Sequence, residues 1–109
     1  MSASVNGTNI SLTRGDSLVL SVNVNAGLEP YDIQEGDVIR FAMKSSINSD
    51  EVLIRKNIDL ETMTLTLQPS DTKNLPFGNY VYDIELTTAD GFVDTFIGPA
   101  TFTLTGEVY

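Results

Sequence analysis

The sequence predicts an all-β fold, an antiparallel β-sandwich of seven to eight strands. Apolar and polar residues alternate along many short segments, as expected for strands with one buried face. Turn residues separate these segments at a spacing close to the roughly 8–12 residues that is typical of a β-sandwich. A sustained apolar period of 3.6 residues, which would indicate a long helix, is missing.

The most informative segment is 71–86, in which a corner containing Pro76 and Gly78 leads directly into a strand. The residues on the apolar face of this strand are Tyr80, Tyr82, Ile84 and Leu86. Immunoglobulin-like sandwiches use a tyrosine at such a corner to attach a loop to a strand. We therefore predict an immunoglobulin-like antiparallel β-sandwich with Tyr80 at its corner.

Alternation predicts four further strands in the first half of the chain, at 9–13, 17–25, 38–44 and 51–58. The second of them has the clearest pattern, with Leu18, Leu20, Val22 and Val24 on its apolar face. The last has no clear sidedness, which a bulge or burial on both faces would explain. Between these strands, the acidic segment 26–37 contains Gly27, Pro30 and Gly36, and is expected to be an exposed loop with Tyr31 and Ile33 facing inward.

The second half of the chain is expected to contain strands at 63–68, 80–88, 92–97 and 100–105, with a helical turn near 70–75. Asp90-Gly91 is a strong signal for a hairpin turn. Gly98-Pro99 is expected to kink the chain between the last two strands, and Gly106 is expected to permit a bulge.

Length and composition indicate a single domain. A chain of 109 residues is too short to build two independent cores. We expect residues 1–8 to form a flexible N-terminal lead-in and residues 9–109 to form one β-sandwich domain. Since the chain has no cysteine, its stability must come from packing and from hydrogen bonds between strands.

The charge balance bears on the partners of the chain. Fifteen acidic and six basic residues give a formal net charge of −9. Such a surface repels phosphate backbones and anionic lipids, so we expect neither a nucleic acid nor a membrane as partner. The sequence shows no signal peptide and no apolar run of membrane-spanning length, so we expect synthesis in the cytoplasm.

Catalysis is not expected. The chain contains no histidine and no cysteine, which removes the commonest general base and a common nucleophile. Pairs of acidic residues could in principle perform acid–base chemistry, but they lie at expected turns. These pairs are Asp50/Glu51, Asp59/Glu61 and Asp90/Asp94. We predict no catalytic residue and a protein that is not an enzyme.

Two loops are candidate calcium sites, because calcium prefers several oxygen ligands from a compact loop. One carries Glu29, Asp32, Glu35 and Asp37, and the other carries Asp90 and Asp94. Neither has the spacing of a known calcium loop, so solvated loops are favoured and no metal or cofactor site is predicted. Arg14-Gly15-Asp16 matches an integrin-binding tripeptide, but a simple turn between strands is the favoured interpretation.

Two sets of side chains could form a binding surface or could belong to ordinary sheet structure. The aromatic set is Tyr80, Tyr82, Phe92, Phe96 and Phe102, and filling of the space between two sheets is its favoured interpretation. The threonine set is Thr62, Thr64, Thr66, Thr87, Thr101, Thr103 and Thr105. Strand propensity on a solvated face is its favoured explanation.

Several segments together carry a resemblance to a known group of proteins. They are residues 10–17, 35–41, 71–72, 78–84, 91–95 and 100–104. The chain resembles short proteins encoded by tailed phages and prophages of Gram-positive gut bacteria, and is similar to the N-terminal β-sandwich of phage baseplate upper proteins. The matching positions are turn and core positions, so no functional residue is transferred.

The resemblance implies a non-enzymatic structural or accessory protein of the virion, on the tail or baseplate or decorating the capsid. Its implied partners are other virion proteins, with a possible homo-oligomer. The alternative is a module that binds carbohydrate or a host surface through the acidic loop and exposed aromatic residues, including Tyr31.

Overall fold

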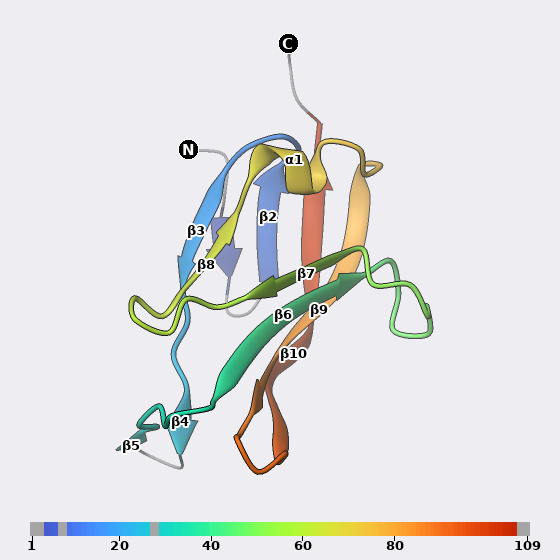
Figure 1. Ribbon diagram of the computed structural model, residues 1–109. Coiled ribbons are helices and arrows are strands. Elements are labelled where there is room, and N and C mark those ends of the chain that lie inside the picture. Colours follow the sequence, from blue (N-terminus) through green and yellow to red (C-terminus); the bar gives the residue numbers. More distant parts are fainter. Residues whose placement is uncertain (1–3, 7–8, 27–28, 107–109) are drawn as a thin grey trace.

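The computed structural model describes residues 4–6, 9–26 and 29–106, and strands dominate them (Figure 1). The elements are β1 (Ser4–Asn6), β2 (Asn9–Thr13), β3 (Leu18–Ser21), β4 (Asn25–Ala26), β5 (Glu29–Pro30), β6 (Val38–Lys44), β7 (Ile54–Asn57), β8 (Thr64–Leu67), α1 (Pro69–Thr72), β9 (Gly78–Thr87) and β10 (Val93–Thr105). The prediction of an all-β fold is confirmed.

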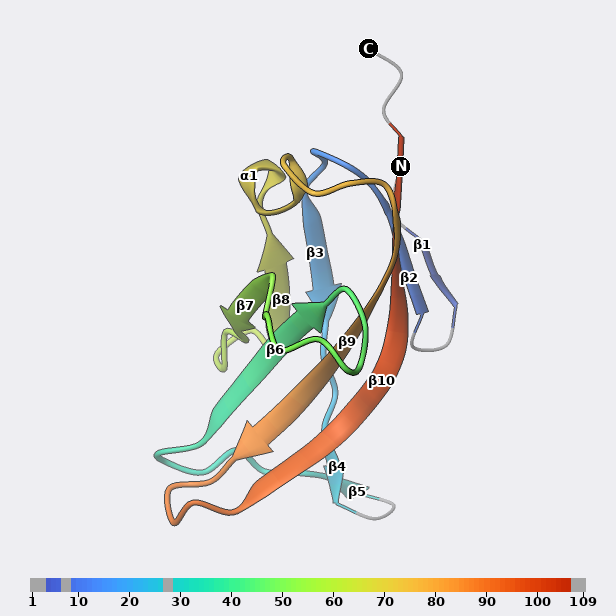
Figure 2. The same cartoon turned by 90° about the vertical axis from the view of Figure 1, so that its right-hand side faces the viewer.

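The main layer is a six-stranded sheet with the order β1-β2-β10-β9-β6-β7. Its strands pair antiparallel except β2 and β10, which pair in parallel, so the sheet is mixed. The sheet curls, and the antiparallel pair β3–β8 lies across from its concave side (Figure 2). A third, minimal pair joins β4 to β5.

The core lies between the large sheet and the β3–β8 pair. Strands β6 and β9 alternate strictly, with Ile39, Phe41 and Met43 buried on one and Tyr80, Tyr82, Ile84 and Leu86 buried on the other. Phe102 of β10 packs edge-on against both Phe41 and Tyr82, with ring centroids 6.4 and 6.3 Å away. An aromatic cluster therefore joins the three central strands of the sheet.

The number and limits of the strands differ from the prediction. The described residues contain ten strands because three very short ones, β1, β4 and β5, join the seven longer ones. β1 lies inside the lead-in expected at 1–8. The expected strand 17–25 is shorter in the structure, because β3 ends at Ser21 and Asn25 belongs to β4. β5 lies inside the expected loop 26–37. After Ser21 the chain stays attached to the turn before β8, since Val22 N–H donates to the Met63 carbonyl at 2.8 Å.

β7 and β8 begin later than the alternation predicts, and β3 and β10 each begin one residue later. Met63 has a φ of 53°, in the left-handed region, so it belongs to the turn and β8 starts at Thr64. Residues 51–53 precede β7, which begins at Ile54. Leu53 nevertheless donates its N–H to the Met43 carbonyl at 2.8 Å, which attaches the segment to β6.

The helical turn is shorter than expected and starts one residue earlier. Pro69 occupies the first turn of α1, where its missing N–H costs nothing. Asp71 caps the turn by accepting the Gln68 N–H at 2.7 Å, and its carboxylate also lies 3.0 Å from the Lys56 ammonium. This ion pair connects α1 to the edge strand β7.

Tyr80 attaches the corner loop to β9 by a hydrogen bond. The Tyr80 hydroxyl donates to the Pro76 carbonyl at 2.5 Å, while its ring is buried at the start of β9. Burial raises the pKa of Tyr80, and the nearby Arg14 guanidinium opposes that shift. The corner loop is thus attached to the strand that follows it.

Tyr80→Phe should lower the free energy of unfolding by about 0.5–1.5 kcal/mol, the net contribution of one hydrogen bond. The ring keeps its packing, so the loss comes from the Pro76 carbonyl that no longer has its partner. Urea denaturation followed by circular dichroism measures the difference. An unchanged denaturation midpoint would contradict a stabilising role for this bond.

The last strand runs through the expected break. β10 spans Val93–Thr105, with register shifts between Thr95 and Ile97 and between Ile97 and Ala100. Gly98 has a φ of 105°, which glycine adopts readily, so the chain bends without leaving the sheet. The predicted kink is therefore an irregularity inside one strand, and Gly106 lies after that strand instead of forming a bulge.

Candidate functional site

The outer face of the six-stranded sheet carries a groove of about 270 Å³, which we call the outer-face groove. Its lining residues are Ala42, Lys44, Ile47, Val81, Tyr82, Asp83 and Pro99. Most of these side chains are apolar, and Ile47 is 62% exposed. The exposed isoleucine adjoins an apolar hollow, which makes this groove the candidate contact surface.

Strand alternation places the groove. Because Phe41 and Met43 point into the core, Ala42 and Lys44 between them point outward. Ala42 stands opposite Asp83 on β9 and Lys44 stands opposite Val81. The small side chain of Ala42 leaves space beside its larger neighbours, and Pro99 borders that space where β10 bends.

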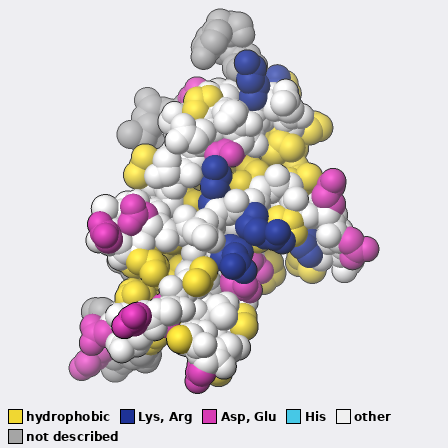
Figure 3. Space-filling model, viewed as in Figure 1, with side chains coloured by type: hydrophobic (Ala, Val, Ile, Leu, Met, Phe, Trp, Pro, Cys, Tyr) yellow, Lys and Arg dark blue, Asp and Glu magenta, His cyan; other side chains and the backbone are white. Residues whose placement is uncertain are grey.

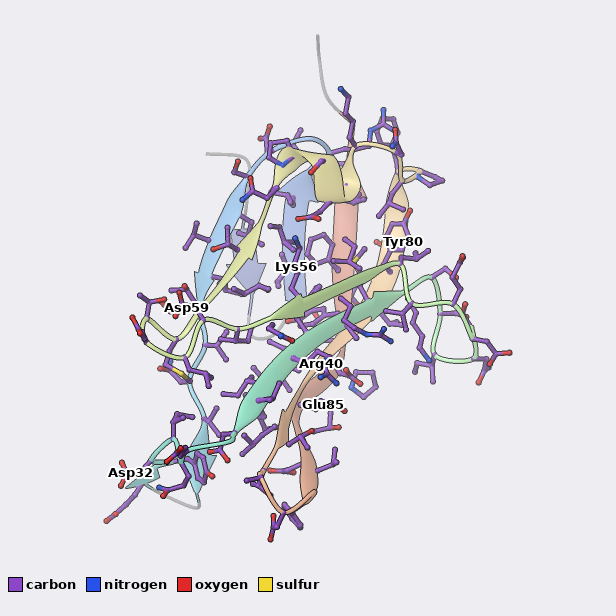
Figure 4. The ribbon with its side chains drawn as sticks, viewed as in Figure 1. Asp32, Arg40, Lys56, Asp59, Tyr80 and Glu85 are labelled. Carbon is purple, nitrogen blue, oxygen red and sulfur yellow. The ribbon has the colours of Figure 1, made fainter. Side chains whose placement is uncertain are left out.

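Basic side chains lie on the β6–β7 side of this groove in an otherwise acidic protein. Arg40 and Lys44 flank Ala42 along β6, and Arg55 stands opposite Ala42 on β7. The Arg40 guanidinium lies 3.8 Å from the Glu85 carboxylate, and the two side chains approach each other from neighbouring strands (Figure 4). Figure 3 shows basic side chains gathered over β6 and β7, with acidic ones mostly toward the rim.

A second hollow, of about 440 Å³, lies between the loop before β6 and the β9–β10 turn, and we call it the Tyr31 groove. Its lining residues are Tyr31, Gln34, Glu35, Asp37, Thr88, Ala89, Asp90 and Phe92. It combines acidic groups with Phe92, which is 65% exposed. This groove brings together the acidic loop and one of the predicted aromatic residues.

Asp37 corrects the prediction that the whole acidic segment is exposed. Its side chain is buried, and one carboxylate oxygen accepts the Tyr31 hydroxyl at 2.9 Å and the Gln34 N–H at 2.8 Å. The hydrogen bond between the Tyr31 hydroxyl and Asp37 is the main cause that raises the pKa of Tyr31. A buried carboxylate requires such partners, so Asp37 organises the loop from inside.

The β9–β10 turn favours the ionised form of Asp90. The Asp90 carboxylate accepts a hydrogen bond from the Thr88 hydroxyl, and this bond is the main cause that lowers the pKa of Asp90. The pKa of Asp90 is lower in the folded state than in the unfolded state, so its ionised carboxylate stabilises the fold at pH values above the unfolded pKa. This stabilisation is lost as the pH falls through the folded pKa.

Thr88→Val should raise the pKa of Asp90 toward its ordinary value, because the hydroxyl donor is removed. Titration of the side-chain carboxyl carbons by nuclear magnetic resonance measures this pKa. Thr103→Val serves as the control, since the Thr103 hydroxyl bonds to Asn79 at the other end of the hairpin. Equal shifts in the two variants would contradict a specific Thr88–Asp90 bond.

The acidic residues do not assemble into a metal centre in the part of the chain that the structure describes. There, no group of three or more histidine, cysteine, aspartate or glutamate side chains could hold a metal ion. Asp32 and Asp59 lie on separate loops (Figure 4). The Asp59 side chain accepts the Glu61 N–H at 2.9 Å, so these two residues form a turn. Aspartate side chains often stabilise turns in this way.

The Arg14-Gly15-Asp16 tripeptide is a turn, as favoured from the sequence. The Arg14 guanidinium lies 4.1 Å from the centre of the Phe77 ring and donates to the Leu75 carbonyl at 3.1 Å. Gly15 N–H donates to the Thr72 hydroxyl at 3.0 Å. The turn is therefore attached to α1 and the corner loop, which opposes its use as an adhesive motif.

The structure tests the two interpretations of the aromatic set and of the threonine set. Tyr80, Tyr82 and Phe102 are buried and Phe96 is partly buried, but Phe92 is exposed, so the interpretation as core filling is wrong for Phe92. Some threonine hydroxyls bond to polar neighbours, as Thr62 does to Thr64 at 2.7 Å. Strand structure accounts without a ligand for the threonines of this set that lie in β8, β9 and β10. Thr62 lies in the turn before β8, so the strand interpretation is wrong for that residue.

Sequence reasoning did not find the outer-face groove. Its residues come from β6, the following turn, β9 and the bend in β10, and only the strand register brings them together. One usable signal was present, because Ile47 is a large apolar residue inside the polar turn 45–50.

Comparison of the chain with protein-family models, with curated proteins and with solved structures finds no match. Among the described residues, no helix has the length and apolar character needed to cross a bilayer.

Proposed function

We propose that this chain is a non-enzymatic structural or accessory protein of a phage virion that acts through protein–protein contacts. Its place is on the tail or baseplate or on the capsid surface, and its partners are other virion proteins. The resemblance of its turn and core segments to phage-encoded β-sandwich proteins supplies the biological setting.

The arrangement of strands supports the finer assignment to an immunoglobulin-like sandwich. β10, β9 and β6 are consecutive in the large sheet, like strands G, F and C of that fold, and β3 pairs with β8 as B pairs with E. The Tyr80 bond to Pro76 resembles the tyrosine corner near the start of strand F.

The outer-face groove is the observation that carries the proposal. An apolar hollow lined by an exposed isoleucine and by Lys44, with Arg40 and Arg55 near it on β6 and β7, fits a protein partner. Interfaces combine an apolar centre with charged groups at the rim that select the partner.

Mass spectrometry of purified phage particles tests the proposal directly, and the chain is expected among the virion proteins. Particles made with Ile47→Asp should contain much less of it, whereas Val19→Asp should be incorporated normally. Val19 is a matched control because it is equally exposed, at 67%, on the separate β3–β8 pair. Absence of the wild-type chain from purified particles would defeat the proposal.

A carbohydrate-binding module is the second candidate, and the Tyr31 groove favours it. The exposed Phe92 ring offers an apolar platform, and Gln34, Glu35 and Asp90 offer polar groups at its side. A small number of polar groups around an apolar surface is the usual composition of a ligand site.

A glycan array distinguishes this candidate from the first. Binding that is lost in Tyr31→Ala and in Phe92→Ser, but kept in Ile47→Asp, would support it. Phe92→Ser is included because Tyr31→Ala also removes the hydrogen bond to Asp37. No reproducible glycan binding by the wild-type chain would exclude it.

A further inference from the structure

We propose that the chain associates head to tail, with the β9–β10 tip of one copy in the outer-face groove of the next. The tip comprises Asp90, Gly91, Phe92, Val93 and Asp94. This inference deepens the proposed function and rests on it for its setting, since it names a second copy of the chain as one of the protein partners.

The tip has the character of a contact element. Phe92 is 65% exposed and Val93 is 54% exposed, next to each other at the end of a hairpin. Acidic residues stand on both sides, and the hydrogen bond from Thr88 favours the ionised form of the Asp90 carboxylate. Adjacent exposed apolar residues between two carboxylates favour a partner that is both apolar and basic.

The outer-face groove offers that combination. Its volume of about 270 Å³ exceeds the ~150 Å³ of an apolar cavity that binds benzene, so a phenyl ring can enter. Arg40, Lys44 and Arg55 outnumber the two acidic groups on this part of the sheet, Asp83 and Glu85. Glu85 is already partnered by Arg40 at 3.8 Å.

The contact must join two different molecules. Val81 lines the groove and Thr87 ends β9 beside the tip, six residues further along a continuous strand. At ~3.3 Å per residue this separates them by roughly 20 Å, so the tip cannot fold back into its own groove. A contact between two different surfaces is heterologous, and its repetition gives a ring if it closes and a filament if it does not.

The contact is small, so its affinity in solution is low. A hairpin tip in one groove buries less than the ~1,200 Å² of a standard stable interface. Repetition around a symmetric particle would strengthen it through effective concentration. Association of the isolated chain must therefore be measured at high protein concentration.

Sedimentation velocity of the wild-type chain up to roughly 0.5 mM should show species that grow beyond the dimer, as weak heterologous contacts do. Phe92→Asp removes the apolar side chain of the tip, and Ile47→Asp removes the exposed apolar side chain of the groove. Each variant alone should associate at least about tenfold more weakly than the wild type. Both residues are exposed, so both variants should keep the circular dichroism and melting temperature of the wild type.

Mixing the two variants gives the decisive result. Phe92→Asp keeps an intact groove and Ile47→Asp keeps an intact tip, so the mixture should form a one-to-one dimer that cannot extend. Val19→Asp, on the β3–β8 pair, should associate like the wild type. A symmetric contact between identical surfaces would give no such rescue.

Four results would overturn the inference: a monomeric wild type throughout this range, unchanged association of either variant, no dimer in the mixture, or an equal loss in Val19→Asp. The proposed function fails by a different observation, namely absence of the chain from purified particles. A monomer that is found on the particle would therefore reject the head-to-tail contact alone.

Discussion

Replacing Phe102 with alanine should lower the free energy of unfolding by about 3–5 kcal/mol, the range for truncation of a buried aromatic residue. Phe102 has no exposed surface, and its ring packs against those of Phe41 and Tyr82. Its strand β10 pairs with β2 on one side and β9 on the other, so the resulting cavity lies at the centre of the sheet. Urea denaturation measures the loss.

Val19→Ala is the control for this experiment. Val19 is also a strand residue, but it is 67% exposed, so its truncation should change the free energy of unfolding by no more than about 0.5 kcal/mol. A similar loss in both variants would mean that the two-layer core does not depend on the aromatic cluster.

Strand alternation was sufficient for the parts of the chain where one face is buried throughout. β2 and β6 have the predicted limits, 9–13 and 38–44, and the inward residues predicted for β9 are all buried. The tyrosine corner was also predictable, because its hydrogen bond joins residues only four positions apart. In these places local sequence and tertiary packing act in the same direction.

Alternation gave wrong predictions of burial where the alternating pattern continues beyond the end of the sheet. Phe92 continues the aromatic pattern of the last strands, but it lies in the turn before β10 and is exposed. Figure 2 shows this β9–β10 turn far from the β3–β8 pair that covers the core. Asp37 was misassigned for the opposite reason. Its burial depends on partners that the tertiary structure supplies, and no local pattern indicates them.

The candidate site could not be predicted from the sequence, because its position depends on the register between strands. Which residues of β6 and β9 face outward follows from alternation, but the pairing of Ala42 with Asp83 and of Lys44 with Val81 does not. The bend at Gly98 and Pro99 then sets where the groove ends. Irregularities within a strand commonly shape such sites.

Gly98→Ala tests that bend, and it should lower the free energy of unfolding by about 2–5 kcal/mol. An added Cβ would lie 2.6 Å from the Tyr82 carbonyl oxygen and 2.9 Å from the Asp83 Cα, which are backbone atoms of the paired strand. Neither can rotate away, so β9 and β10 would have to separate. The φ of 105° adds a conformational cost for any residue with a side chain.

Gly91→Ala separates the steric cost from the conformational one. Gly91 has a similar φ of 90°, but an added Cβ there meets no atom within 4 Å. Its substitution should cost only about 1–2 kcal/mol, the price of a left-handed backbone for alanine. Chemical denaturation of both variants gives the difference, which measures how closely β9 and β10 approach at the bend. Equal losses would mean that the strands separate easily there, and the border that Pro99 gives to the outer-face groove would then not be fixed by the sheet.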